Sequence, residues 1–302
     1  MLTPPHTQPE PAATDSAALR PLIIASATLT LLFALPLFNL ARFALQSSLY
    51  SHIVLIPFIS LYLARQRRSA EPDHTPPNRP LALAFFSLGL VALAVWALPT
   101  LSGNTFDRED SLTLTTFSFL GFFAALCAWL LGRQTLHRQL FPLAFLLFML
   151  PMPVALESAI ETVLQHGSAA VAQALFGLAG TTVFVDGLIF QLTNITLRIA
   201  PECSGIHSSL ALLITSILAG SLFLRSPVRR TLLALAVFPL ALFRNGFRVF
   251  VLGELCVHIS PDMINSYIHH NGGPIFFVLS LIPFALLLIL LVRTERQPSP
   301  KP

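Results

Sequence analysis

The feature that most constrains the fold of this chain is a series of apolar runs, each long enough to cross a lipid bilayer. A transmembrane helix needs about 20 consecutive, predominantly apolar residues. Such runs occur at residues 21–40, 46–64, 81–99, 111–131, 140–157, 204–224, 230–250 and 273–292. Only 11% of the residues are charged, against about 25% in soluble domains, which excludes a soluble globular protein. We therefore predict an all-α polytopic membrane protein with about eight transmembrane helices.

The arginines and lysines predict the orientation, because cytoplasmic loops carry an excess of both. If the N-terminus is cytoplasmic, 13 of the 18 basic residues lie on that face. They belong to residues 20, 64–80, 132–139, 225–230 and 293–302. We predict a multi-pass protein of the cell inner (plasma) membrane, in contact with membrane lipids, with both termini cytoplasmic. These short basic clusters do not form a nucleic-acid binding surface, so no nucleic-acid partner is expected.

The two ends of the chain are predicted to lie outside the membrane domain. Residues 1–20 are polar and proline-rich, without the basic start and cleavage site of a signal peptide, and we predict a disordered cytoplasmic tail. Residues 293–302 are predicted to form a second cytoplasmic tail. The transmembrane domain then covers residues 21–292.

Residues 158–203 differ from the rest and are predicted to form an extracytoplasmic cap. The stretch ESAIETVLQHGSAAVAQALFGLAG is typical of an interfacial amphipathic helix that ends at glycine. It is followed by VFVDGLIFQLTNITLRIA, in which β-branched and polar residues alternate around Asp186-Gly187. An Asp-Gly pair between alternating runs indicates a β-hairpin. The cap leads directly into Cys203.

Cys203 is the first polar residue in this chain that needs an explanation. A lone cysteine in an apolar chain usually acts as a small hydrophobic residue, which is our interpretation of Cys127. Cys203 instead lies at the predicted start of a helix, which Ser204 is placed to cap, beside Glu202. The free N–H groups at a helix start lower the pKa of a thiol. Cys203 is therefore a candidate nucleophile.

Two arginines four residues apart form the second candidate feature, in the stretch FRNGFRVF. Arg244 and Arg248 share one helical face, with Asn245 between them. Either arginine alone is consistent with snorkelling to the headgroups. The two together near the outer end of an apolar run indicate a polar site, because a charge in a span normally faces a cavity or a partner.

The third feature is the pair His269 and His270 in YIHHNGGPIFF, just before the last apolar run. A histidine at an interface is often only a hydrated residue, but a pair at a helix start is well placed to move protons near neutral pH. No acidic and histidine cluster at ligand spacing accompanies the pair, so no metal or other cofactor is expected. A thiol, a fixed cation and an imidazole on one face are the groups that acyl transfer needs.

Five stretches of the chain resemble the exosortase/archaeosortase family of membrane cysteine transpeptidases. ECSGI (202–206), NGFR (245–248) and HHNGG (269–273) are similar to the family's cysteine, Asn-x-x-Arg and His-x-x-x-Gly motifs. LYSHIVLIPFISLYLARQRR (49–68) and FMLPMPVALE (148–157) resemble its amino-terminal and mid-chain signatures. The similarity extends from about residue 45 to 290.

The resemblance implies catalytic roles for Cys203, Arg248 and His269. Arg244 is an alternative to Arg248 because it lies one helical turn away. His270 is an alternative to His269, which the spacing to Gly273 favours.

Three further residues receive supporting roles by the same resemblance. Glu202 and Asn245 would orient the catalytic groups, and His52 would help to position the substrate. The implied substrates are exported proteins that end in a short motif such as Pro-Glu-Pro, one transmembrane helix and a basic cluster. The enzyme would cleave at the motif through a thioester and transfer the acyl group to an acceptor.

Two other classes of protein compete with this interpretation. A transporter would place charges near the bilayer midplane on broken helices, whereas acidic residues here avoid the apolar runs almost entirely. A non-catalytic membrane subunit of an exopolysaccharide assembly or export system would use Cys203 in an outer-face disulfide with Cys256. The transporter is disfavoured by the charge pattern, and the scaffold remains the alternative.

Overall fold

The computed structural model describes residues 13–67, 75–201, 204–265 and 273–296, and the chain divides at Val154 into two compact units. The Glu202–Cys203 pair and the His269–His270 pair lie outside the described residues. Each unit is described by itself below.

The first unit is entirely helical where it is described. Its elements are α1 (Ala13–Leu32), α2 (Ala34–Gln46), η1 (Ser51–Val54), α3 (Ile56–Gln66), α4 (Arg79–Leu101), α5 (Arg108–Leu130), α6 (Arg133–Phe145) and η2 (Leu146–Met149). Helices α4 and α5 pack closely because glycines meet at their contact. A Cβ added at Gly121 would lie 2.9 Å from the Cα atom of Gly89. Helix α1 begins at Ala13, within the segment predicted to be disordered.

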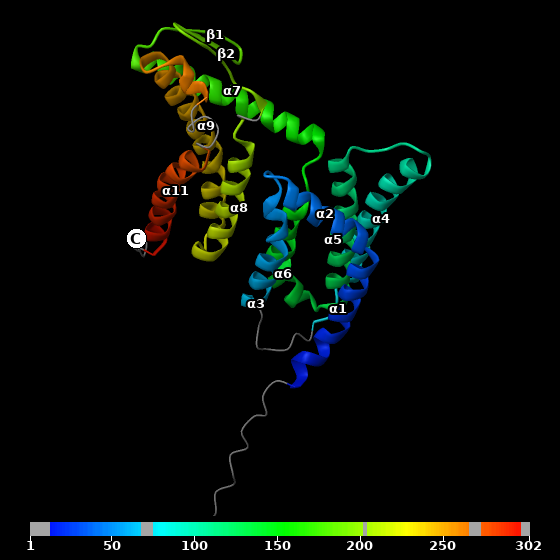
Figure 1. Cartoon of the computed structure of the whole chain (residues 1–302). Helices are drawn as coiled ribbons and strands as arrows, with labels where there is room; N and C mark the ends of the chain where they lie inside the picture. Colours follow the sequence, from blue (N-terminus) through cyan, green and yellow to red (C-terminus); the bar gives the residue numbers. More distant parts are fainter. Residues whose placement is uncertain (1–12, 68–74, 202–203, 266–272, 297–302) are drawn as a thin grey trace, which may run out of the picture. The chain divides into compact units, whose positions relative to one another are not determined.

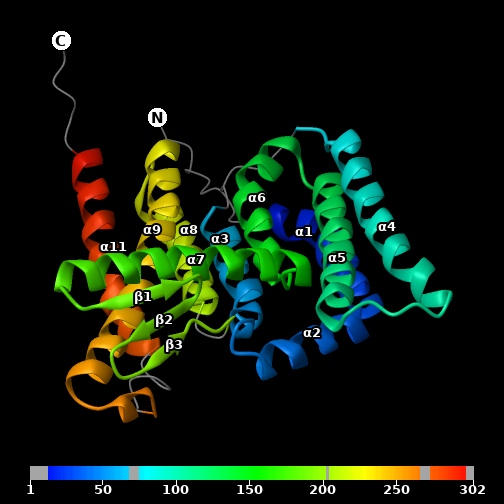
Figure 2. The same cartoon turned by 90° about the horizontal axis from the view of Figure 1, so that it is seen from above.

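The second unit combines a helical bundle with a small sheet. Its elements are α7 (Val154–Ala179), β1 (Val183–Asp186), β2 (Ile189–Leu192), β3 (Thr196–Arg198), α8 (Ile206–Phe223), α9 (Pro227–His258), η4 (Pro261–Asn265) and α11 (Gly273–Arg296). Helix α7 runs across one end of α8 and α9, and the sheet lies beside it (Figures 1 and 2). Phe176 of α7 is fully buried between Phe190 of β2 and Phe250 of α9, so the sheet and both helices share one apolar core.

The prediction of a helix and hairpin before Cys203 is confirmed. Helix α7 ends as expected at a glycine, since Gly180 has a φ of 75° and the Thr181 N–H bonds back to the Phe176 carbonyl. Strands β1 and β2 are antiparallel, with Asp186 paired to Ile189, so Gly187 and Leu188 form the turn. The sequence did not predict β3, which pairs antiparallel with β2 and gives the order β1-β2-β3.

The predicted number of eight transmembrane helices is not confirmed. Within the described residues, five helices (α4, α5, α8, α9 and α11) are long and apolar enough to cross a membrane, or up to seven if each of two interrupted helix pairs is one span. Proline explains two of the differences, because it removes a helical hydrogen bond. Pro36 lies just after the 73° bend between α1 and α2, and residues 150–153, which include Pro151 and Pro153, separate η2 from α7. The apolar run 46–64 forms the short helix η1 and the 11-residue α3, and neither is long enough to cross a membrane.

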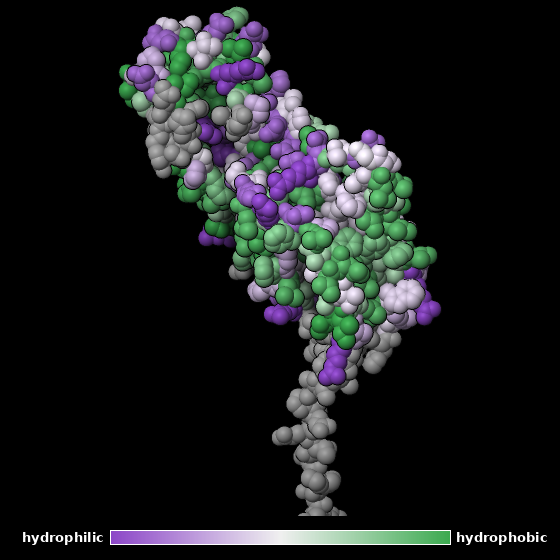
Figure 3. Space-filling model, turned by 45° about the vertical axis from the view of Figure 1, so that its right-hand side comes forward, coloured by the Kyte–Doolittle hydropathy of each residue, from purple (hydrophilic) through white to green (hydrophobic). Residues whose placement is uncertain are grey.

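The helices expose broad apolar surfaces, as a membrane protein requires. Leu83 of α4, Leu235 of α9 and Leu286 of α11 are each more than 60% exposed. Figure 3 shows such side chains, in green, over much of the helical surface. Apolar patches of this extent mark a surface that is covered by lipid or by another protein.

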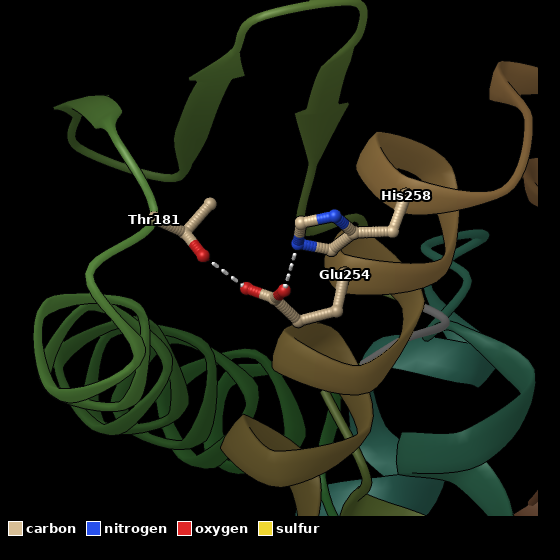
Figure 4. A network of polar contacts seen from close by, with 3 residues as sticks. All are labelled: Thr181, Glu254 and His258. Atoms are coloured by element: carbon tan, nitrogen blue, oxygen red, sulfur yellow. Dashed lines mark hydrogen bonds and ion pairs between the residues drawn. The ribbon is translucent and has the colours of Figure 1, made fainter.

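Helix α9 is longer than its apolar run. Its 32 residues correspond to about 48 Å, whereas the hydrocarbon core of a bilayer is about 30 Å thick. The helix continues to His258, eight residues beyond the end of the apolar run 230–250. Near its end, the Glu254 carboxylate accepts a hydrogen bond from the Thr181 hydroxyl and lies 3.0 Å from Nε2 of His258 (Figure 4). This contact ties the α7–β1 junction to α9.

We expect the Thr181–Glu254 bond to contribute more to stability than the Glu254–His258 pair. Thr181→Val removes a hydrogen bond to a mostly buried carboxylate and should cost about 1.5 kcal/mol. His258→Ala should cost less than about 1 kcal/mol, because the imidazole is largely exposed. Thermal unfolding of both variants in detergent measures the difference, and an equal loss would contradict this ranking.

The crossing of α7 and α9 depends on a glycine. A Cβ added at Gly246 would lie 2.6 Å from Cβ of Val171 and 2.8 Å from the Ser168 carbonyl oxygen. Small residues allow two helix backbones to approach in this way. Gly177 of α7 is the natural comparison, because nothing lies within 4 Å of a Cβ at that position.

Gly246→Ala should therefore destabilise the second unit by about 1–3 kcal/mol through overpacking. Gly177→Ala should leave stability unchanged or raise it by up to about 1 kcal/mol, since alanine favours a helix interior. Melting temperatures of the two variants in detergent are the measurement. A similar melting temperature for both would show that the crossing is not tightly packed.

Candidate functional site

The candidate site is built around the start of α8. Its first described residue after the Glu202–Cys203 pair is Ser204, which is 1% exposed and whose Oγ accepts a hydrogen bond from the Ile206 N–H at 3.4 Å. Gly205 occupies the N-cap position with a φ of 77°. A Cβ at Gly205 would lie 3.2 Å from the Arg244 guanidinium and 3.3 Å from the Asn245 amide. The turn therefore needs glycine for both its conformation and its space.

Asn245 joins three segments of the second unit. Its side chain is 3% exposed, and Nδ2 donates to the Ser168 hydroxyl of α7 at 3.1 Å and to the Ser204 carbonyl at 3.2 Å. Both contacts are buried, where a satisfied amide makes a specific link. Asn245 thus holds the turn that precedes α8 against α7 and α9.

Arg244 lies beneath the same turn and does not snorkel, since only 7% of it is exposed. Its Nη2 donates to the Gly205 carbonyl and to the Ser209 hydroxyl, both at 3.2 Å. Within the described part of the chain, its Nη1 is buried without a hydrogen-bond partner. The guanidinium is thus committed mainly to the first turn of α8.

Arg248, one helical turn further along α9, has different surroundings. It is half-buried and lines a cavity of about 130 Å³ together with Asn245 and residues 197–200. Leu252 of α9 and Ile264 of η4 complete the apolar part of the wall. Arg248 therefore lines a cavity between β3 and α9, in contrast to Arg244, which does not line it.

The other predicted residues are distributed as follows. Glu202, Cys203, His269 and His270 lie outside the described residues. His52 belongs to the first unit, where its Nδ1 lies 3.1 Å from the Leu49 carbonyl oxygen. The structure thus brings together Ser204, Arg244 and Asn245, and places Arg248 beside Asn245 at the cavity.

The two described cysteines are buried, free thiols. Cys127 is 4% exposed, in accord with its interpretation as a small hydrophobic residue, and Cys256 is fully buried. A free Cys256 does not form the disulfide with Cys203 that the scaffold alternative uses. Among the residues that the structure describes, no group of three or more His, Cys, Asp or Glu side chains is suited to hold a metal ion.

Comparison with known proteins identifies the family. The sequence model of a family described as transmembrane exosortase (Exosortase_EpsH) matches residues 42–286. The chain belongs to this family. No curated protein and no solved structure matches the chain. The match covers all five stretches on which the resemblance rested, so the predicted family is confirmed.

Several residues that shape the exosortase site were not found from its sequence. Ser168 and Ser209 accept the hydrogen bonds of Asn245 and Arg244, and Gln165 donates to the Ile199 carbonyl next to the cavity. The run of small residues 167–170 in α7 was the available signal, since such residues mark close helix crossings. Their partners on α9 are far away in sequence, so the pattern alone does not identify them.

Asn245→Asp should destabilise this exosortase, because it removes the two N–H donors and places a carboxylate against the Ser204 carbonyl. The expected loss is about 1–3 kcal/mol, the cost of leaving buried groups unsatisfied. The same substitution at Asn104, which is exposed in the first unit, is the control and should have little effect. Thermal unfolding in detergent compares the two, and equal melting temperatures would contradict the role of Asn245.

Proposed function

We propose that this exosortase is an integral-membrane cysteine transpeptidase. It cleaves the C-terminal sorting signals of exported proteins through a thioester and transfers the acyl group to an acceptor. The observation that supports the proposal best is the position of Arg248. Arg248 lines a cavity together with Asn245, whose amide binds the Ser204 carbonyl in the turn that follows Cys203 in the chain. A cation near a nucleophile can stabilise the oxyanion that forms during acyl transfer.

Cys203 is the proposed nucleophile. It lies three residues before the first residue of α8, where unpaired backbone N–H groups favour a thiolate. Ser204 and Gly205 are anchored by Asn245 and Arg244. A fixed turn next to the nucleophile reduces the entropy lost when the thiolate reaches the substrate carbonyl.

The two arginines are proposed to have different roles, one in catalysis and one in positioning. Arg248 stabilises the oxyanion, because it lines the cavity and arginine stays charged in a partly dry site. Arg244 is a positioning residue, because its hydrogen bonds go to the Gly205 carbonyl and Ser209. This division favours Arg248 as the catalytic arginine and gives Arg244 a separate part in holding the site.

The proposed reaction has two balanced steps, with His269 as the proton carrier and His270 as its alternative. The Cys203 thiolate attacks the carbonyl carbon, the peptide C–N bond breaks, and the imidazolium protonates the leaving amine. In the second step the neutral imidazole removes a proton from the acceptor nucleophile, which attacks the thioester. The C–S bond breaks, the acyl group passes to the acceptor, and the thiolate is restored. Glu202 is proposed to orient these groups, and His52 to position the substrate.

The proposed location is the inner membrane, with the site on the extracytoplasmic face. The basic turn 225–230 lies at the opposite end of α8 from Gly205. This turn is tied to the end of α11, because the Glu295 carboxylate accepts from the Arg225 and Ser226 N–H groups. If the arginines are cytoplasmic, as the positive-inside rule predicts, the end of α11 is cytoplasmic as well, and the substrate's own transmembrane helix brings its motif to the outer face.

A processing assay tests the proposed function. The protein is co-expressed with an exported protein that ends in a Pro-Glu-Pro motif, a transmembrane helix and a basic cluster, and the size of this substrate is followed. Wild type should process it and trap an acyl adduct on residue 203. Cys203→Ala should abolish processing, whereas Cys256→Ser should retain it. Equal processing by Cys203→Ala would exclude the thioester mechanism.

The same assay, together with a melting curve, distinguishes the proposed roles of Arg248 and Arg244. Arg248→Ala should reduce turnover by about 10²–10³-fold, as expected for loss of one oxyanion donor, with an unchanged melting temperature. Arg244→Ala should lower the melting temperature, because it leaves the Gly205 carbonyl without its partner. If Arg244→Ala instead reduced turnover at an unchanged melting temperature and Arg248→Ala lowered the melting temperature, the two proposed roles would be exchanged.

A further inference from the structure

The strand that leads to Cys203 lies at the edge of its sheet. The sheet order is β1-β2-β3, and among the described residues β3 pairs on one side only, with β2. The Ile199 N–H donates to the Leu188 carbonyl and the Leu192 N–H to the Ile195 carbonyl. In an antiparallel ladder these bonds alternate with pairs that point away from the partner. The backbone groups of Thr196 and Arg198 therefore point to the outer edge.

An outward row of N–H and C=O groups is a template for another extended segment. Native proteins commonly use such an edge to bind a peptide, with main-chain bonds for affinity and side-chain pockets for specificity. Here the edge is short, since β3 has three residues. A segment that adds to this strand would form main-chain hydrogen bonds over a few residues only, which suits a short recognition motif.

A cavity adjoins this strand and no other strand of the sheet. The lining of this space of about 130 Å³ includes Leu197 and Arg198 of β3 and residues 199–200 that follow the strand, and no described residue of β1 or β2. This volume is about four times the share of one water in the liquid, enough for a single side chain. Among the described residues that line it, both charged ones are arginines, Arg198 from β3 and Arg248 from α9. The complementary ligand is a side chain that carries a carboxylate.

From the edge, the cavity and the two arginines we infer that β3 is the substrate-binding strand of this protein. An extended substrate segment with an acidic side chain adds to the free edge of β3, and Arg198 recognises the carboxylate. This inference rests on the proposed function, and it names the recognition element of the same site. The segment would lie beside a strand whose next residues lead to Cys203, so binding delivers the scissile bond to the thiol.

The side-chain pattern of β3 fits this role. Leu197 and Ile199 are 5% and 3% exposed and belong to the apolar core, whereas Thr196 and Arg198 are exposed. Residues opposite each other on neighbouring strands place their side chains on the same face. An acidic residue paired with Arg198 would thus present its carboxylate to that guanidinium, and core packing keeps the strand in register.

The test measures peptide binding to the full-length Cys203→Ala protein in nanodiscs. The probe is a fluorescein-labelled peptide Ser-Val-Pro-Glu-Pro-Ala with both ends capped. Three analogues are compared with it: one with glutamine in place of glutamate, one with an N-methyl group on the glutamate nitrogen, and one with both changes. Arg198→Gln is the key variant. Arg225→Gln is its matched control, because it removes the same charge from an exposed site at the far end of α8.

Strand addition predicts a specific pattern of dissociation constants. N-methylation of the glutamate should weaken binding by about tenfold, since it removes the central main-chain donor. Arg198→Gln should weaken binding of the glutamate peptide by about fivefold, the factor expected for a cross-strand charge pair. It should leave the weaker binding of the glutamine peptide unchanged. Arg225→Gln should bind all four peptides as the parent protein does.

Two results would overturn the inference: unchanged binding after N-methylation, or equal effects of Arg198→Gln and Arg225→Gln. Absence of any binding would also overturn it. The proposed function is read separately, from the acyl adduct on Cys203 when wild type is mixed with the probe. The predicted binding pattern without an adduct would contradict the transpeptidase and leave the binding strand in place. An adduct that is independent of Arg198 would contradict the binding strand alone.

Discussion

The close crossing of α7 and α9 at Gly246 is the contact on which the rest of the second unit depends. Because Gly246 has no side chain, the backbone of α7 approaches near enough for Asn245 to reach Ser168. The same amide then holds the Ser204 carbonyl. The position of the turn before α8 therefore follows from how closely these two helices approach.

Buried polar groups give this crossing its specificity. In a membrane, an apolar helix face interacts about as favourably with lipid tails as with another apolar helix face. Packing and hydrogen bonds therefore decide which helices associate. Arg244 and Asn245 are adjacent in sequence yet satisfy different parts of one turn, the Gly205 and Ser204 carbonyls. Arg248, on the same helical face, remains at the cavity. One stretch of α9 thus supplies both the support of the site and the charge proposed to act in it.

The length of α9 links this site to the sheet. The helix continues past its apolar run, so its last turns can contact the α7–β1 junction through Glu254 and the core through Gly253, where Phe176 packs against the backbone. The sheet in turn ends in β3, directly before Cys203. The cap is therefore an extension of the helical bundle, and its edge strand is held by the same helix that carries Arg248.

Sequence alone determined the membrane class, the family, and the helix and hairpin before Cys203. Apolar runs, an Asp-Gly turn and a glycine helix end are local signals that act over a few residues. It did not determine the number of spans. Hydropathy shows which segments are apolar enough to lie in lipid, but it does not show where prolines such as Pro36, Pro151 and Pro153 interrupt the hydrogen bonds of a helix. Nor did it show that α9 continues to His258, since polarity marks the edge of the bilayer and not the end of a helix. The separate surroundings of Arg244 and Arg248, the partner Ser168 and the free edge of β3 were decided by tertiary structure, because each depends on residues that lie far apart in the chain and meet only in the folded protein.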